Sequence, residues 1–306
     1  MDIMLDEKII DEIKALTEEK RVLVKEPLSS HTTFKIGGNC DALVFVKSVN
    51  ELKDVLSFLK KNEISYFVMG NGSNLLVSDN GYRGVIVSLM QMNEIEIFGN
   101  RMHVGAGAKN GQIAQAAKDN SLTGYEALAG IPGSIGGGIY MNAGAYNSEM
   151  KDVVEFVEVL DKDLNTLAIS DENMKFKYRS SIAKEKGYII TGAILRFLPG
   201  NKDEISASMA EYAGKRKEKQ PLEYPSAGST FKRPEGNFAG KLIEEAGLRG
   251  FSVGGAQVSE KHCGFVINKQ NATADDVNKL ICEIQKRVKE NSGVDLEKEV
   301  ILLGEF

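Results

Sequence analysis

The chain has 306 residues, a formal net charge of −5 and an ordinary globular composition, with 42% apolar and 26% charged residues. This length allows two or three domains. The acidic balance argues against a nucleic-acid-binding protein with a basic surface, and no apolar run approaches the roughly 18 residues that a membrane-spanning segment needs. An anionic small-molecule substrate would therefore need a local basic patch.

Cysteine and histidine usage predicts neither a disulfide framework nor a metal site. Cys40, Cys263 and Cys282 are odd in number and far apart, and the histidines lie in unrelated segments. The amino terminus carries acidic residues where a signal peptide would carry basic ones. These features predict a reduced, cytoplasmic protein, and they indicate no obligate protein partner.

The first 83 residues alternate helical and strand patterns, which predicts a small α+β lobe. Apolar residues at helical spacing predict helices within residues 5–20 and around 52–59, and β-rich runs lie at 22–46 and 65–70. The last of these runs leads into the glycine-rich segment GNGSNLLVSDNG, from Gly70 to Gly81.

This first glycine-rich segment fails the test for a Rossmann nucleotide site. A Rossmann fingerprint requires a strand, then G-x-G-x-x-G, then a helix, whereas here Gly70 and Gly72 lead into a second strand at Leu75. Glycine lets backbone amides approach a ligand and form an anion-binding nest, so the segment is consistent with a dinucleotide held by loops between strands. A plain tight turn is the alternative, since turns attract the same residues.

Residues 84–199 are mostly strand-like, which predicts a second lobe. One helix is expected at 110–120, and strands are expected at 85–89, 94–99, 101–107, 153–161, 164–170, 174–181 and 188–198. Gly105 and Gly107 precede the helix, but Gly111 lies one residue too far for a Rossmann fingerprint. We therefore interpret them as a strand-to-helix turn, with direct phosphate contact as the alternative.

The second glycine-rich segment, GIPGSIGGGIYMNAGAY, runs from Gly130 to Tyr146 and is predicted to bind a ligand. It holds six glycines within 15 residues, and ordering such a loop would cost much conformational entropy unless something filled it. A serine-hydrolase elbow is excluded because GxSxG does not occur: Pro132 stands where the first glycine before Ser134 would be.

The remaining region, 200–306, is predicted to be a separate domain. A helix over 202–219 leads to a small-residue loop at 226–234, and six cations lie at this junction: Lys215, Arg216, Lys217, Lys219, Lys232 and Arg233. They are consistent with a phosphorylated ligand, although a charged helix end is ordinarily a solvated face.

Two further helices and a last strand complete the expected elements. One helix covers 239–247, with Gly247 as its C-cap, and a longer helix begins at Thr273, where T-A-D-D resembles a capping box. A final strand at 294–303 would place four residues on one face by its period of two: Asp295, Glu297, Glu299 and Ile301.

Taken together, these segments resemble one family, the UDP-N-acetylenolpyruvoylglucosamine reductases of peptidoglycan synthesis, in its compact type II branch. The likeness extends from residue 31 to residue 300. Any one segment is weak evidence, but eight in this order are highly specific: HTTFKIGG, GNGSNLLVSDNGY, GIPGSIGGGIYMNAGAY, YRSS, PSAGSTFKRP, AGKLIEEAG, GGAQVSEKH and LEKEV.

The resemblance implies an α+β protein with a two-lobed FAD-binding domain of the vanillyl-alcohol-oxidase (PCMH) type at 1–199. Its lobes are expected at about 1–83 and 84–199, followed by an α/β substrate domain at 200–306 whose last strand returns to the first lobe. FAD is the implied cofactor and NADPH the implied reductant. The residues implied for FAD are Gly70, Asn71, Gly72, Ser73, Asn74, Leu75, Gly130, Ile131, Pro132, Gly133, Ser134, Gly136, Gly137, Asn142 and Gly144.

The implied reaction reduces the enolpyruvyl ether of UDP-N-acetylglucosamine to UDP-N-acetylmuramate, with hydride passing from flavin N5 to the β-carbon. Negative charge then builds on the α-carbon and its carboxylate, where a fixed cation stabilises the transition state. Arg179 in YRSS matches the family's catalytic arginine, and its planar fork suits a carboxylate. A surface arginine on a strand is the alternative reading.

Two further residues are implied for the proton transfer, and three for the uridine diphosphate. Ser229 matches the family's proton donor, and Glu299 matches the glutamate that assists it, with Glu297 as the alternative. The three residues implied for the nucleotide are Lys219, Lys232 and His262.

The chain departs from the family pattern at two positions, and two rival functions stay open. Ile301 and Arg233 stand where the family usually has arginine and asparagine. Another flavin oxidoreductase on the same scaffold would need no proton donor to carbon. A non-catalytic nucleotide-binding module would show neither flavin colour nor NADPH oxidation.

Overall fold

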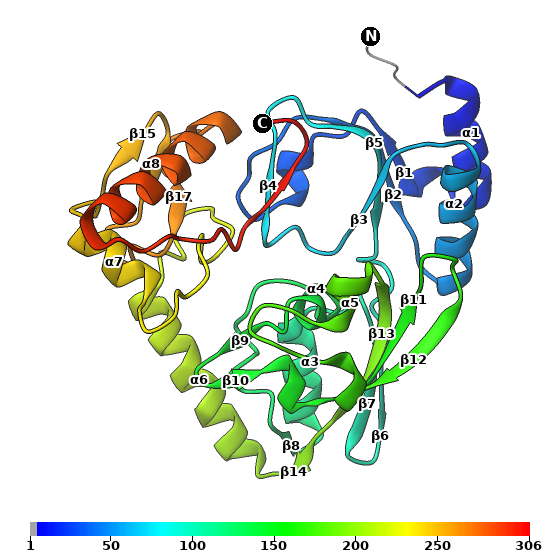
Figure 1. Cartoon of the computed structure of the whole chain (residues 1–306). Coiled ribbons are helices and arrows are strands. Elements are labelled where there is room, and N and C mark those ends of the chain that lie inside the picture. The colour runs from blue at the N-terminus through cyan, green and yellow to red at the C-terminus, as the bar shows by residue number, and fades with distance from the viewer. Residues whose placement is uncertain (1–4) are drawn as a thin grey trace. The chain divides into compact units, whose positions relative to one another are not determined.

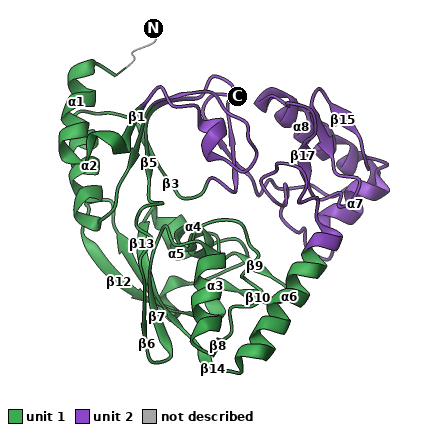
Figure 2. Cartoon of the chain, turned by 180° about the vertical axis from the view of Figure 1, so that it is seen from behind, with its two compact units in different colours: residues 1–23, 42–71, 84–216 green, residues 24–41, 72–83, 217–306 purple. Residues whose placement is uncertain are grey.

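The computed structural model describes residues 5–306 and divides into two compact units, each built from several pieces of the chain (Figures 1 and 2). Unit 1 comprises residues 1–23, 42–71 and 84–216, and unit 2 comprises residues 24–41, 72–83 and 217–306. Both mix helices and strands, which confirms the predicted α+β class. The domain division predicted at residue 199 stays a prediction, and the amino-terminal expectation rests partly on residues 1–4, outside the described range.

The first sheet has the strand order β1-β2-β5-β3, and α1 packs against α2 beside it. Helix α2 begins where Ser48 accepts a hydrogen bond from the backbone N–H of Glu51. Arg21 is 4% exposed, and Glu51 neutralises it at 2.6 Å. The bounds are α1 (Glu7–Leu16), α2 (Val49–Lys61), β1 (Val22–Val24), β2 (Cys40–Phe45), β3 (Tyr66–Met69) and β5 (Tyr82–Ser88).

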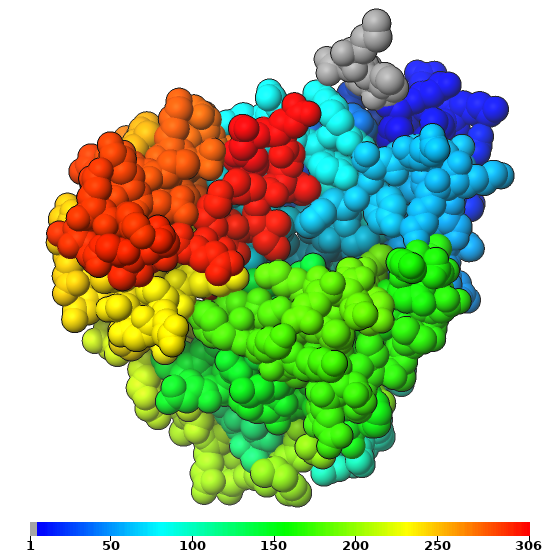
Figure 3. All heavy atoms as spheres, viewed as in Figure 1, coloured from blue at the N-terminus to red at the C-terminus, as the bar shows by residue number. Residues whose placement is uncertain are grey.

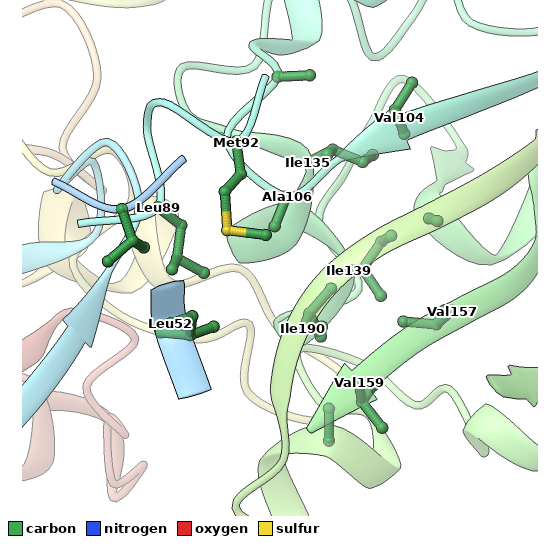
Figure 4. Close-up of a cluster of buried hydrophobic side chains, with 14 of the residues drawn as sticks. Leu52, Leu89, Met92, Val104, Ala106, Ile135, Ile139, Val157, Val159 and Ile190 are labelled. Atoms are coloured by element: carbon green, nitrogen blue, oxygen red, sulfur yellow. The ribbon is translucent and has the colours of Figure 1, made fainter. Parts of the chain in front are cut away.

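The second sheet of unit 1 has the order β12-β11-β13-β7-β6, and all its neighbouring strands are antiparallel. Its strands are β6 (Ile95–Phe98), β7 (Arg101–Gly105), β11 (Val154–Leu160), β12 (Thr166–Ser170) and β13 (Ile189–Arg196). Figure 4 shows Ile135 and Ile139, from helix α4 (Ile135–Tyr140), among core side chains of these strands such as Val104, Val157 and Ile190. The buried face of α4 therefore fixes the second glycine-rich segment to the sheet.

Smaller elements complete unit 1. The remaining helices are α3 (Asn110–Asp119), α5 (Ile182–Lys186) and α6 (Lys202–Lys219), and four short 3₁₀ helices lie at Glu19–Arg21, Leu28–His31, Met150–Asp152 and Glu172–Met174. Of these elements, the 3₁₀ helix Leu28–His31 belongs to unit 2. Helix α6 begins in unit 1, and its last three residues belong to unit 2. Two short antiparallel pairs are β8 (Leu122–Thr123) with β14 (Leu198–Pro199), and β9 (Gly144–Ala145) with β10 (Ser148–Glu149).

Unit 2 has its own core, in which α8 (Ala274–Ser292) buries its apolar face. The antiparallel sheet beside it consists of β15 (Ser252–Val253), β16 (Ala256–Val258) and β17 (Val266–Asn268), and α7 (Ala239–Glu245) packs on α8. The last strand, β18 (Ile301–Leu303), pairs in parallel with β4 (Leu75–Val77). Figure 3 shows the red carboxyl-terminal residues at the surface, beside the cyan segment.

Several sequence predictions are confirmed and three are wrong. Helix α6 covers 202–219 as predicted, and Thr273 caps α8 in a capping box. The second glycine-rich segment, however, contains helix α4, because packing of its isoleucines outweighs the low helix propensity of glycine. Residues 174–181 form a 3₁₀ helix and a turn instead of a strand, and the final strand covers only 301–303.

Candidate active site

The two glycine-rich segments meet inside unit 1 at Gly70 and Ser134. A side-chain carbon at Gly70 would collide with the Oγ of Ser134 as it is placed, so the two segments are in close contact at this point. The Ser134 side chain is 3% exposed, and its hydroxyl has no hydrogen-bond partner among the described residues. Leaving a buried polar group unpaired costs about 1–3 kcal/mol. The unpaired hydroxyl therefore indicates a place for a polar ligand atom.

Backbone contacts hold the rest of the second segment in place. A side-chain carbon at Gly136 would collide with Ala106, whereas one at Gly137 would meet nothing within 4 Å. Asn110 is buried and donates its Nδ2 proton to the carbonyl of Ile131 at 3.0 Å. Sequence reasoning missed Asn110, although an asparagine opening a helix beside a glycine-rich loop is a usable signal. The segment is thus anchored on one side and open at Gly137.

In unit 2, the residues around Thr33 connect the first glycine-rich segment to the serine loop. Gly72 has a φ of +62°, and a side chain there would collide with the carbonyl oxygen of His31. The backbone N–H of Thr33 donates to the Gly72 carbonyl at 3.3 Å, and its hydroxyl donates to the Ser226 carbonyl at 2.7 Å. Gly72 therefore makes room for the protein's own backbone.

Ser229 and Glu299 lie on two segments of unit 2 that pair through their backbones. Phe231 and Lys298 form an antiparallel bridge, and the backbone N–H of Glu299 donates to the carbonyl of Thr230 at 2.9 Å. Ser229 is half-buried and directly precedes Thr230. The backbone pairing therefore brings the segments that carry Ser229 and Glu299 side by side.

Asn74 holds the Glu299 segment from the other side. Its Nδ2 donates to the Glu299 carbonyl at 3.1 Å, and its own carbonyl accepts from the backbone N–H of Ile301 at 2.9 Å. Leu75 then pairs with Ile301 at the start of β4 and β18. The side-chain amide of Asn74, which was predicted to bind cofactor, thus fastens the first glycine-rich segment to the carboxyl-terminal segment.

Arg179 belongs to unit 1 and lies in a tight turn with a φ of +53°. Left-handed backbone is unfavourable for a side chain other than glycine, by about 1–2 kcal/mol, and such residues concentrate at functional sites. The turn is closed by mutual backbone hydrogen bonds between Lys177 and Ser180, and the guanidinium lies 4.9 Å from the centroid of the Tyr178 ring. The strand alternative for Arg179 is therefore excluded.

Asn142 attaches the second glycine-rich segment to this turn. Its side chain is fully buried, and its Nδ2 donates to the carbonyl of Lys177 at 3.1 Å and to the carboxylate of Glu149 at 3.1 Å. Its Oδ1 accepts from the backbone N–H of Lys151 at 3.1 Å. Asn142 was predicted to bind FAD, but its side chain forms these hydrogen bonds within the protein. Through Lys177 it holds the turn that contains Arg179.

The three residues implied for the uridine diphosphate differ in their exposure and in their contacts. Lys219 is exposed at the end of α6, whereas Lys232 forms an ion pair with Glu297. The Nδ1 of His262 accepts from the backbone N–H of Gly264 at 3.1 Å, and burial lowers the pKa of His262 below its ordinary value. A neutral ring held in this way carries its proton on Nε2 and can donate it to a phosphate or a base.

The other predicted cofactor residues lie along these same segments. Asn71 and Ser73 are half-buried next to Gly72, Gly133 has a φ of +131°, and Gly144 begins β9. The predicted cofactor residues of the second segment that are exposed or half-buried are Gly130, Ile131, Pro132, Gly133, Gly137 and Gly144. Glu297, the alternative to Glu299, is 72% exposed at its side chain and engaged with Lys232.

The described residues contain no group of His, Cys, Asp and Glu that could hold a metal ion. Within 5–306, no helix is both long and apolar enough to cross a membrane. A flavin nucleotide, by contrast, fits unit 1: the unpaired Ser134 hydroxyl offers it a hydrogen bond, and the open face at Gly137 offers it space.

Comparison with known proteins agrees with this geometry. Residues 40–169 match a family model described as an FAD binding domain, which places the chain among the flavin-binding proteins. Residues 220–303 match the model of the UDP-N-acetylenolpyruvoylglucosamine reductase C-terminal domain. Together with the fold, these matches define an FAD-dependent oxidoreductase with a PCMH-type cofactor domain.

Relatives that match nearly the whole chain show the family to which it belongs. The chain is 51% identical over 98% of its length to the UDP-N-acetylenolpyruvoylglucosamine reductase of Caldanaerobacter subterraneus subsp. tengcongensis, and covers 99% of that protein. It resembles the crystal structure of the reductase from Thermus caldophilus with a TM-score of 0.78 and 36% identity, covering 92% of this chain and 98% of that one. The glucose dehydrogenase Phl p 4.0202 shares the fold alone, at 13% identity and a TM-score of 0.50 over 64% of this chain and 44% of that one. The chain belongs to the UDP-N-acetylenolpyruvoylglucosamine reductase family.

Proposed function

We propose that this protein is an NADPH-dependent reductase that converts UDP-N-acetyl-3-O-(1-carboxyvinyl)-glucosamine to UDP-N-acetylmuramate in peptidoglycan precursor synthesis. NADPH and nucleotide sugars are cytoplasmic metabolites, so the reaction is proposed for that compartment. The observation that carries the proposal is the backbone pairing of the Ser229 and Glu299 segments, fastened by Asn74 to the first glycine-rich segment. A flavin oxidase does not protonate a substrate carbon, so it would not need a proton donor such as Ser229.

FAD, when bound, supplies the hydride that reduces the double bond of the substrate. Arg179 is proposed to bind the substrate carboxylate, because a planar guanidinium stabilises the charge that develops there more in the transition state than in the ground state. The strained turn holds its backbone in place, so little reorganisation accompanies the reaction.

Ser229 is proposed to donate its proton to the α-carbon. Serine is a weak acid in water, so it serves this role only toward a very basic carbon and only from a fixed position. The hydrogen bond between Thr230 and Glu299 fixes the backbone on both sides of the site. Glu299 is proposed to assist the proton transfer, while Lys219, Lys232 and His262 are proposed to bind the uridine diphosphate.

The test is an anaerobic titration of the purified yellow protein. NADPH should bleach the flavin absorbance, and the enolpyruvyl sugar nucleotide should restore it with formation of the lactyl ether. UDP-N-acetylglucosamine, which lacks the double bond, is the matched control and should leave the flavin bleached. Bleaching without recovery on the enolpyruvyl substrate would favour another flavin oxidoreductase, and a protein that binds no flavin would be a different kind of nucleotide-binding module.

A further inference from the structure

Two buried arginines of unit 1 differ in what balances their charge. Arg21, 4% exposed, has the carboxylate of Glu51 at 2.6 Å. Arg216, 8% exposed, forms no ion pair with any Asp or Glu in the described part of the chain. A guanidinium cannot lose its proton in a protein, so a buried one without a counter-charge carries a large desolvation cost. Arg216 therefore requires an explanation that Arg21 does not.

The position of Arg216 follows from the spacing of α6. Ile205, Met209, Tyr212 and Arg216 recur at intervals of three to four residues, which places them on one helix face. Ile205 is buried, and Met209 packs against the core of unit 1. Arg216 thus continues an apolar face inward, unlike its exposed neighbours Lys215 and Lys217, so the alternative of a solvated helix end does not apply to Arg216.

The surroundings of Arg216 are aromatic and glycine-rich. Its guanidinium carbon lies 6.0 Å from the centroid of the Tyr146 ring, and Tyr146 stacks on Tyr212 at 4.9 Å. A side-chain carbon at Gly130 would lie only 3.0 Å from the Arg216 Nε. Gly130 and Tyr146 are the first and last residues of the second glycine-rich segment. Burial lowers the pKa of Arg216, with only Tyr146 opposing that shift.

We propose that Arg216 is a cofactor-binding residue whose guanidinium neutralises a negative charge of bound FAD. FAD offers two such charges: the permanent diphosphate, and the pyrimidine side of the isoalloxazine, which gains negative charge when the flavin is reduced. The family model for FAD binding ends at residue 169, so this contact lies outside the matched segment. The proposal rests on the FAD cofactor and is independent of the identity of the sugar nucleotide.

The decisive variant is Arg216→Met, with Lys217→Met as the matched control that removes one exposed charge a residue away. If Arg216 contacts the diphosphate, Arg216→Met should bind FAD about 10- to 100-fold more weakly, the usual worth of a charge-assisted hydrogen bond, with an unchanged midpoint potential. If it contacts the isoalloxazine, the potential should become more negative by about 30 mV for each tenfold loss of preference for the reduced flavin. Arg216→Lys should recover part of either effect.

A purely structural role is distinguished by thermal unfolding of the full chain with and without FAD. Because Arg216 is an unbalanced charge in the absence of cofactor, Arg216→Met should leave the Tm of the FAD-free protein unchanged or raise it, while the Tm of the FAD-loaded protein falls. An equal fall of both Tm values would overturn the proposal. So would FAD affinity and midpoint potential that both match those of Lys217→Met.

Discussion

Unit 1 and unit 2 differ in what surrounds the predicted site residues that each of them contains. In unit 2, the first glycine-rich segment contacts the protein's own chain: Gly72 makes room for the backbone of His31, and Asn74 and Thr230 form hydrogen bonds with the Glu299 segment. Unit 1 leaves groups unsatisfied at its glycine-rich segment, notably the Ser134 hydroxyl and the Arg216 charge. The difference teaches that glycine-rich composition alone does not identify a ligand contact. At Gly72 glycine makes room for the protein's own backbone, whereas at Gly137 the space beside it is open.

The largest effect is expected for Ser229, in unit 2. Ser229→Ala should lower turnover by roughly 10²- to 10⁴-fold, the usual worth of a positioned general acid. In stopped-flow absorbance, flavin reduction by NADPH should keep its rate, and reoxidation by the enolpyruvyl substrate should account for the whole loss. Ser226→Ala, in the same loop, is the control and should behave as the unaltered protein. Equal slowing of both half-reactions by Ser229→Ala would assign Ser229 another role.

The second-largest loss of turnover is expected at Arg179, in the strained turn of unit 1. Arg179→Met should reduce turnover by about 10²- to 10³-fold, as expected for loss of one charged transition-state contact. Arg179→Lys should recover little, because an ammonium does not reproduce the planar fork. Steady-state kinetics on both variants check this, and Lys177→Met in the same turn is the control. Full activity in Arg179→Lys would mean that charge alone matters there.

Two glycine substitutions compare the units directly. Gly72→Ala should destabilise the protein by more than about 2 kcal/mol, because its backbone is left-handed and the added carbon meets backbone. Gly137→Ala should stabilise the FAD-free protein by about 0.5–1 kcal/mol, because alanine is the better helix former and the space is open. Urea unfolding measures both. If both variants were equally destabilised, the proposed contrast between the two segments would be wrong.

The smallest effect concerns pH and His262. Burial lowers the pKa of His262 in the folded protein below its ordinary value near 6.5, so the unfolded chain takes up the proton first as the pH falls. This contribution to stability is present above about pH 6.5 and is lost as the pH falls toward the folded pKa. His262→Gln should flatten that part of the stability profile, measured by urea unfolding between pH 7.5 and 5. An unchanged profile would show that His262 does not titrate in this range.

The sequence predicts the regular elements well where local signals decide them. Helix α6 and the capping box at Thr273 follow from spacing and polar caps alone. Helix α4 could not be predicted, because its glycines disfavour a helix and only packing of Ile135 and Ile139 against the sheet overrides them. The contacts of Thr33 and Asn74 join residues about 190 and 225 positions apart, and no local pattern reveals them.

The central proposal is that Arg179 and Ser229 act in the same reduction of the enolpyruvyl group, and a double-mutant cycle tests it most directly. Flavin reoxidation is timed in the unaltered protein, Arg179→Met, Ser229→Ala and the double variant. Residues that act as one catalytic set are strongly non-additive, so the double variant should be nearly as fast as the slower single variant. Losses that simply multiply would show that the two residues serve separate steps and would contradict this account.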